Sequence, residues 1–268
     1  VFADNMSLHA GGGAFITAAT FAALGHTAGV LATLPAAPFD GIVKCAMDTA
    51  KVDASLCLSA PKGAAPQVTV AMPCDADRAF LSHKSGAAVP EIKGIPTHWK
   101  HLHIGEFRTL LEHPDLAKMA RAAGMTLSLD CGWDEGILAD GSAMSKLLQS
   151  VDVFLPNEAE YARLIDSGLT VNATTLTVVK CGENGSKAFA NDDWIAAPSK
   201  LVNVVDATGA GDAFNGGFLS SWLAGASIRS CLIAGNCCGA AAVQGVGGIS
   251  GLDLIKMGMD AGNIDAAE

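Results

Sequence analysis

The pattern of hydrophobic and polar positions in the second half of the chain predicts strands that alternate with helices. Short apolar runs have the length and composition of buried strands, at 101–105, 126–130, 151–156 and 175–182. The intervening segments have apolar residues at helical spacing, at 114–124, 144–150 and 158–165. Alternating strands and helices indicate βαβ units and a parallel sheet. Such sheets bind ligands at the carboxyl ends of their strands, which here are followed by Asp130, Asn157 and Gly182.

The first part of the chain predicts a core helix and a hairpin. Residues 14–25 are rich in Ala, follow a run of three glycines and end at Gly25, a suitable helix C-terminus. Residues 68–83 have the pattern of two strands around a polar turn, which predicts a hairpin projecting from the main body. No repeat, low-complexity tract or charged linker divides the sequence. We therefore expect a single domain over residues 1–268 with a small β segment near 68–83.

Composition favours an α/β protein with a large core. Of the 268 residues, 50% are hydrophobic, 6% are aromatic and 30 are Gly, which suits helices packed closely on a sheet. The formal charge is −10 and the 17 Lys and Arg are scattered, so no basic stripe is available for nucleic acid. Residues 6–39 are uncharged, but glycines, prolines and His26 interrupt them. A membrane span is therefore not expected.

Cysteine and histidine residues give weaker chemical signals. The eight Cys lack CxxC spacing and a secretory leader, which fits reduced thiols in a cytoplasmic protein. The adjacent Cys237 and Cys238 are interpreted as buried core residues. His101 and His103 share one face of their expected strand, a spacing that two metal ligands can use. Because no third ligand lies nearby in sequence, packed histidines are the favoured interpretation.

The stretch DATGAGDAF at 206–214 carries the strongest chemical signal. LVNVV at 201–205 predicts a strand and 213–225 predicts a helix, so the glycines lie at a strand-to-helix turn. The amides of Gly209, Ala210 and Gly211 would then point outward at a helix N-terminus. Such amides, together with the helix dipole, bind an anion such as phosphate.

Asp212 would repel that phosphate unless it has a task of its own. One interpretation is that the carboxylate stabilises the helix dipole. The other, which the motif favours, is that it takes the proton from a hydroxyl attacking a phosphoryl group. Asp206 and Thr208, just before the glycines, either cap the turn locally or help to build an ion site.

The longer stretch DATGAGDAFNGGFL resembles the second signature of the ribokinase-like (PfkB) carbohydrate kinase family. LPNEAEYARL at 155–164 is similar to the Asn-Glu-x-Glu segment of that family, and VVKCGENGSKAF at 178–189 to its nucleotide-binding strand-turn-strand. The resemblance implies a three-layer, Rossmann-like parallel sheet with helices on both faces and a small β lid. It also implies transfer of the γ-phosphate of ATP to an alcohol.

The resemblance also implies roles for individual residues. Asp212 is the base, and the amides of Gly209, Ala210 and Gly211 form the anion hole. The implied nucleotide contacts are Asn157, Lys180, Gly182, Gly185, Thr208 and Asn236. The alternative for Lys180 is a solvated lysine at a strand end. Glu160 is implied to hold hydrated Mg²⁺, whose charge separates a carboxylate from the phosphates; the alternative for Glu158 and Glu160 is helix N-terminal charge. Asp206 and Thr208, with residues 243–250, are implied to hold a monovalent cation, K⁺.

On the acceptor side, Gly11 and Gly12 match the glycine pair of the family, but Ile16 stands where a sugar-binding Asn is usual. Family members begin with a strand that carries a substrate-binding Asp, whereas this sequence begins at Val1, so either that segment is missing or the site is altered. Arg78 in the lid either reads the acceptor or is solvated. DCGWDE at 130–135 replaces the Asp-x-Asn-x-Arg of several sugar kinases, which leaves the acceptor open.

We therefore expect an ATP-dependent kinase of a small sugar or sugar acid. A nucleoside kinase of the same family is the alternative. A catalytically silent sugar-binding regulatory protein is disfavoured, because Asp212 and GAGD are intact. Val68, Val70 and Met72 would form an exposed apolar face on the lid, which suggests a homodimer formed through the lids.

Overall fold

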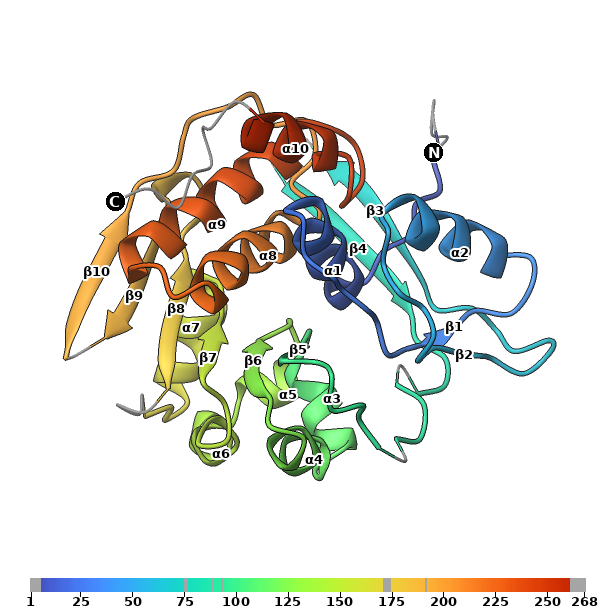
Figure 1. Ribbon diagram of the computed structural model, residues 1–268, viewed down its shortest axis with the longest axis horizontal. Coiled ribbons are helices and arrows are strands. Elements are labelled where there is room, and N and C mark those ends of the chain that lie inside the picture. The colour runs from blue at the N-terminus through green and yellow to red at the C-terminus, as the bar shows by residue number, and fades with distance from the viewer. Residues whose placement is uncertain are drawn as a thin grey trace.

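The computed structural model describes residues 6–74, 77–87, 89–92, 94–170, 175–190 and 192–260. A six-stranded sheet lies at its centre, with strand order β10-β9-β8-β7-β6-β5 (Figure 1). Its strands are β5 (His101–Ile104), β6 (Thr126–Asp130), β7 (Val153–Leu155), β8 (Leu176–Lys180), β9 (Ser186–Ala190) and β10 (Asp193–Ala197). The pairs from β5 to β8 are parallel, as expected, and β9 and β10 continue the sheet in antiparallel fashion.

Helices cover both faces of this sheet (Figure 1). One face carries α1 (Gly13–Ala23), α8 (Ala210–Leu223), α9 (Ile228–Ala242) and α10 (Leu252–Asp260). The other carries α3 (Phe107–Glu112), α4 (Leu116–Ala122), α5 (Glu135–Leu138), α6 (Gly141–Leu148) and α7 (Glu158–Asp166). In β7, Val153 and Leu155 pack with the core on the α8 side, whereas Phe154 packs with the core on the opposite side. The expected three-layer α/β fold is confirmed.

Small residues let α8 approach α9 closely. A Cβ atom added at Gly217 would lie 2.7 Å from Sγ of Cys238, and one at Gly235 would lie 2.7 Å from the ring of Phe214. Cys238 is fully buried and Cys237 half-buried, which agrees with their interpretation as core residues. Within the described ranges, no helix is long and apolar enough to cross a membrane.

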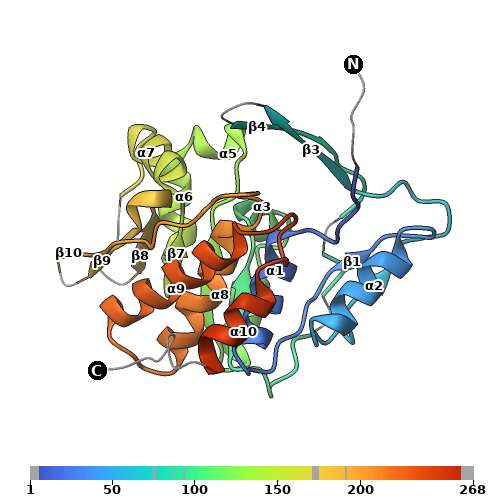
Figure 2. The same ribbon diagram turned by 90° about the horizontal axis from the view of Figure 1, so that it is seen from above.

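The expected hairpin is present as β3 (Val68–Cys74) and β4 (Asp77–His83). Figure 2 shows it standing apart from the central sheet and its helices. The same part of the chain also forms α2 (Asp40–Thr49) and the short parallel pair β1 (Thr33–Leu34) and β2 (Leu58–Ser59). The backbone of Arg78 belongs to β4, but its side chain lies outside the described part of the structure, so its contact with an acceptor stays a prediction.

The strand expected at 201–205 is not formed, and that prediction is wrong. The segment crosses the surface between β10 and α8, with Leu201 81% exposed and Val204 61% exposed. The amides of Val205 and Asp206 both donate to the carbonyl oxygen of Val243, at 2.8 and 3.2 Å. Its β-branched composition favours a strand, but the backbone of this segment is tied to the end of α9 and not to a strand of the sheet.

Candidate active site

Asp212 lies in the first turn of α8, where the N-termini of α8 and α1 meet. A Cβ atom at Gly13, the first residue of α1, would lie 2.6 Å from Oδ1 of Asp212. The hydroxyl of Thr17, one turn further along α1, donates to the carbonyl oxygen of Asp212 at 3.1 Å. The backbone of Asp212 is thus bonded to α1, and its carboxyl group lies against the first residue of that helix.

The glycine turn before Asp212 has the geometry of a helix N-terminus. Gly209 is the N-cap of α8 with φ of 77°, a left-handed conformation that favours glycine. The first N–H groups of a helix lack partners within the helix and can bind an anion. The amide of Ala210 also lies 3.3 Å from the carbonyl oxygen of Ala207, so it is partly engaged. A Cβ atom at Gly211 would lie 3.3 Å from Nζ of Lys180.

Lys180 lies beneath this turn in a buried polar cluster. Its Nζ donates to Oδ2 and Oδ1 of Asp130 at 2.8 and 3.0 Å and to Oδ1 of Asn215 at 3.3 Å. The Nδ2 group of Asn215 donates in turn to Oδ2 of Asp130. The side chains of Lys180 and Asp130 are only 11% and 9% exposed. The ammonium group expected to contact phosphate is therefore neutralised by a carboxylate of the protein.

The crowding of carboxyl groups shifts several pKa values. Burial, reinforced by the charges of Asp130 and Glu160 and opposed by Lys180, raises the pKa of Asp212 to about 7. Burial and the charge of Asp130 also raise the pKa of Glu160. Burial lowers the pKa of Lys180, but the surrounding carboxylates outweigh it and raise that pKa above its ordinary value. Lys180 thus stays charged, while Asp212 can exchange a proton near neutral pH.

Asn157 and Glu160 form a capping box at the start of α7. The amide of Asn157 donates to Oε2 of Glu160, and the amide of Glu160 donates to Oδ1 of Asn157, each at 2.8 Å. Glu160 thus lies in the first turn of the helix, where the alternative interpretation placed its charge, and it also caps the helix, a role that was not expected from the sequence. Glu160 is only 6% exposed and interacts electrostatically with Lys180 and Asp130, which keeps its charge at the same edge of the sheet.

Two of the residues expected on the nucleotide side, Gly185 and Asn236, lie around the end of β10. A Cβ atom at Gly185 would lie 2.7 Å from the amide nitrogen of Ser199. The Nδ2 group of Asn236, on α9, donates to the carbonyl oxygens of Ala197 and Pro198 at 3.0 and 3.2 Å. Gly182 opens a short 3₁₀ turn, η1 (Gly182–Asn184), that connects β8 to β9. The turn and α9 are therefore brought together, and the side chain of Asn236 helps to fix the loop between them.

The two loops expected to enclose a monovalent cation also lie side by side. Oδ1 of Asp206 accepts from the amide of Thr208 at 2.9 Å, and Oδ2 accepts from the amide of Gly247 at 3.0 Å. The same loops are joined by the bonds from 205 and 206 to the carbonyl oxygen of Val243. Asp206 thus caps its own turn, as one interpretation expected, and ties this turn to the 243–250 loop.

On the acceptor side, the structure leaves Gly11 and Gly12 open, since a Cβ atom at either would meet nothing within 4 Å. Ile16 is 3% exposed, and its side chain packs against Gly209 and Gly248. The residue that replaces the usual Asn therefore supports the loop before Asp212. Asp134 belongs to the DCGWDE segment, which differs from the family pattern. Its side chain caps α5 by accepting from the amides of residues 136 and 137, and it forms an ion pair with Arg108.

Three neighbours of the site were not expected from the sequence. Gly13 abuts the Asp212 carboxyl, Asn215 joins Lys180 to Asp130, and Glu106 packs against Gly132 at the ends of β5 and β6. Gly13 is the third member of the glycine run, and Asn215 lies three residues after Asp212, one helical turn away. Their positions beside recognised motifs are the signals that point to them. Glu106 has no such signal.

His101 and His103 belong to a row of hydrogen bonds between β5 and β6. Nε2 of His101 and Nδ1 of His103 both contact Oγ of Ser128, at 2.7 and 2.8 Å, and Nδ1 of His101 contacts Oγ1 of Thr126 at 2.8 Å. Burial lowers the pKa of His101 to about 3 and that of His103 to about 4. Within the described ranges no three His, Cys, Asp or Glu residues are gathered as a metal site. Both histidines are neutral at physiological pH, as packed histidines are.

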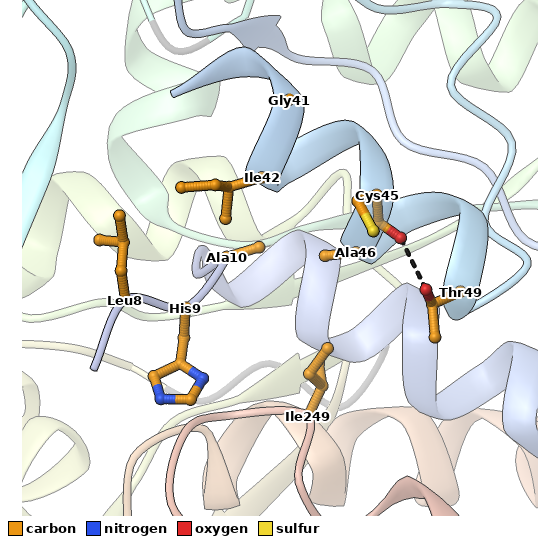
Figure 3. A pocket seen from close by; sticks show the side chains of 9 residues that line it. All are labelled: Leu8, His9, Ala10, Gly41, Ile42, Cys45, Ala46, Thr49 and Ile249. Carbon is orange, nitrogen blue, oxygen red and sulfur yellow. Dashed lines mark hydrogen bonds between the residues drawn. The ribbon is translucent and has the colours of Figure 1, made fainter. Parts of the chain in front are cut away.

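A separate hollow of about 480 Å³ lies between α2 and the segment that precedes α1 (Figure 3). Its lining is mostly apolar and consists of Leu8, His9, Ala10, Gly41, Ile42, Cys45, Ala46, Thr49 and Ile249. It contains none of the charged groups that surround Asp212. The phosphate chemistry is therefore assigned to the cluster at the strand ends and not to this hollow.

Comparison with solved structures shows that the fold is the ribokinase fold. The adenosine kinase from Sinorhizobium meliloti is 22% identical with a TM-score of 0.78, covering 94% of this chain and 83% of that chain. A ribokinase II of E. coli, solved in complex with ATP and Mg²⁺, is 20% identical with a TM-score of 0.72, covering 96% and 92%. At these identities, the likeness defines the fold alone.

Sequence comparison places the chain in a family. The pattern of the family described as "pfkB family carbohydrate kinase" matches residues 3–254. The ATP-dependent ribose-1-phosphate kinase of Halopiger xanaduensis is 30% identical over 148 residues, which cover 52% of this chain and 47% of that protein. The chain thus spans about half the length of the curated relatives that it matches. The protein belongs to the pfkB carbohydrate kinase family, and the family expected from its sequence motifs is confirmed.

Proposed function

We propose that the protein is an ATP-dependent kinase that transfers the γ-phosphoryl group to a hydroxyl of a small sugar or sugar acid. The observation that carries this proposal is the carboxyl group of Asp212. It lies beside the glycine amides of a helix N-terminus, and its pKa is raised to about 7. Relatives support the same chemistry, since several are named as kinases of sugars or sugar derivatives: a ribose-1-phosphate kinase, a fructoselysine 6-kinase and a ribokinase.

Asp212 acts as the base in this proposal. A base whose pKa lies near the working pH combines a large deprotonated fraction with a sufficient affinity for the proton. The acceptor hydroxyl gives its proton to Asp212, and its oxygen forms a bond to the γ-phosphorus as the bond to the bridging oxygen of ADP breaks. The amides of Gly209, Ala210 and Gly211 stabilise the charge on the phosphoryl oxygens.

The remaining charged and polar groups fit the ligands of such a reaction. Hydrated Mg²⁺ prefers oxygen ligands and keeps most of its waters, so it makes few direct contacts with protein. Asn157 and Glu160 would supply such oxygen atoms at the start of α7. When bound, Mg²⁺ neutralises phosphate charge. Asp206 and Thr208 with the 243–250 loop would hold K⁺. The nucleotide would lie along Gly182, Gly185, Thr208 and Asn236.

The test is a release assay for ADP with a panel of acceptors and a base-deficient variant. Ribose, fructose, 2-keto-3-deoxygluconate and adenosine are each offered with ATP and Mg²⁺ to the wild-type protein and to Asp212→Asn. We expect ADP formation with one of the sugars or sugar acids, and its loss in the variant. Binding of a sugar without any ADP formation across the panel would contradict the proposal and favour a silent regulatory protein.

A nucleoside kinase is the second candidate. It is favoured by Ile16, which packs into the core where the family has a sugar-reading Asn. The adenosine kinase named above shares the fold, but its substrate is not thereby transferred to this chain. ADP formation with adenosine and with none of the sugars would establish this candidate in place of the first.

A further inference from the structure

The buried cluster beneath Asp212 depends on an unusual reach across the sheet. Lys180 ends β8 and Asp130 ends β6, and β7 runs between these two strands. The Lys180 side chain nevertheless reaches past the chain of β7 to the Asp130 carboxylate, with Nζ 2.8 Å from Oδ2. The backbone of Lys180 is fixed as well, since its amide donates to the carbonyl oxygen of Pro156 at 2.9 Å. The backbone of Lys180 and its ammonium group are therefore both held by hydrogen bonds.

Asn215 connects this ion pair to the helix that carries Asp212. It lies three residues after Asp212, so the two side chains share one side of α8. Its side chain is fully buried, accepts from Lys180 through Oδ1 and donates to Asp130 through Nδ2. The other oxygen of Asp130, Oδ1, accepts from the amide of Cys131 at 2.7 Å. The ammonium group of Lys180 and both carboxylate oxygens of Asp130 are thus hydrogen-bonded to groups of the protein.

Charge explains why such a pair is needed at this place. Asp212 interacts electrostatically with Asp130 of β6, Glu160 of α7 and Lys180 of β8. From α1 it meets the backbone of Gly13 and the hydroxyl of Thr17, neither of which carries a charge. His103 faces the pair from β5 and is neutral above pH 5, because its pKa is about 4. The carboxyl groups of Asp130, Glu160 and Asp212 therefore share one positive charge, that of Lys180. Without that cation, an ionised Asp212 would stand against two other buried carboxylates.

We propose that Lys180, held by Asp130 and Asn215, is a positioning residue for the Asp212 carboxylate and not a ligand of the nucleotide phosphates. The ammonium group keeps Asp212 in its ionised, proton-accepting form, and Asp130 keeps the ammonium group from moving to the phosphates. This role rests on the proposed function of Asp212 as the base. This role predicts two opposite effects. Loss of Lys180 disfavours the ionised form of Asp212, and loss of the Asp130 charge favours that form.

The test measures the ionisation of Asp212 directly, by carbon NMR of the carboxyl groups in the full-length protein, with Asp212→Asn to assign the signal. We expect Lys180→Met to move the titration midpoint of Asp212 to higher pH and Asp130→Asn to move it to lower pH, each by about 1 to 3 units. The acid limb of the kcat profile should move in the same two directions. The Kd for ATP should change by less than about threefold in Lys180→Met.

Opposite shifts separate this role from a merely structural one, which would impair both variants alike. Shifts in one direction, or no shift, would overturn the proposal, as would a Kd for ATP raised tenfold or more in Lys180→Met. Asn215→Leu, which keeps both charges, serves if either charge variant fails to fold, and should broaden or shift the Asp212 titration. Because the NMR titration needs no turnover, a protein that phosphorylates no acceptor still tests the cluster independently of the proposed function.

Discussion

Oδ1 of Asp212 occupies the space that a side chain at position 13 would need, since a Cβ atom there would lie 2.6 Å from it. Gly13→Ala should therefore displace the carboxyl group and lower kcat by about 10²-fold, as misplacement of a catalytic group by about 1 Å does. Gly41→Ala is the matched control, because a Cβ atom at Gly41 on α2 meets nothing within 4 Å. Equal kcat values for the two variants would show that this contact does not position the base.

Replacement of Asp212 by Asn keeps the size and hydrogen bonding of the side chain but removes its ability to accept a proton. We expect kcat to fall by roughly 10²- to 10⁴-fold. The Kd for ATP should hold or improve slightly, because a negative charge near the phosphates is lost. Asp253→Asn is the control, since Asp253 lies in the first turn of α10 with its side chain 91% exposed. Near-normal kcat in Asp212→Asn would refute the catalytic assignment.

The raised pKa of Asp212 also predicts a pH dependence of stability. The pKa is about 7 in the folded protein, above the value of about 3.9 in an unfolded chain. The folded state therefore binds this proton more tightly, and the wild-type protein loses stability as the pH rises from about 4 to about 7. Asp212→Asn avoids that loss, which is at most about 4 kcal/mol.

This prediction is checked by melting temperatures of both proteins at pH 5 and pH 8. The melting temperature of Asp212→Asn relative to the wild type should be higher at pH 8 than at pH 5. At pH 8 the variant should melt at a higher temperature than the wild type. A variant that melts lower than the wild type at pH 8 would instead indicate an Asp212 that stabilises the helix N-terminus, an effect of about 0.3 to 1 kcal/mol.

The adjacent loops around Asp206 and Gly247 predict activation by potassium. A cation held between them would order the turn that leads into the anion hole, because Asp206 bonds to the amides of both Thr208 and Gly247. The rate of ADP formation should rise when a bulky organic cation is replaced by K⁺ at constant ionic strength. Equal rates in the two buffers would contradict a role for a bound monovalent cation in activity.

The hairpin predicts a homodimer. Val70, Met72 and Leu81 share one face of β3 and β4 and are 49%, 43% and 66% exposed. Pairing of two such faces would remove apolar surface from water, so we expect a dimer by light scattering at micromolar concentration. Leu81→Glu should yield a monomer, whereas Leu254→Glu, at a 43% exposed position on α10, should not. A wild-type monomer would contradict the prediction.

Local patterns predicted the parallel strands β5 to β8 and the helices α1, α4, α6, α7 and α8, because βαβ alternation depends mainly on residues near in sequence. They did not predict β10, α3, α5 or α10. They failed at 201–205, where the bonds to Val243 of a distant helix override strand propensity. The pairing of Lys180 with Asp130 was equally out of reach of the sequence, since it depends on the order of the strands in the sheet. The GAGD motif indicated the base, but not the groups that surround it.

The close contacts of α8 have a consequence for how the protein can diversify. Besides its approach to α9, α8 meets α1 at Gly216, where a Cβ atom would lie 2.7 Å from Cβ of Thr20. A helix locked on two sides cannot shift to suit a new acceptor without losing these contacts. The hairpin stands outside that packing (Figure 2). Mutations that alter acceptor preference should therefore accumulate in β3 and β4, while the helix that carries the base remains unchanged.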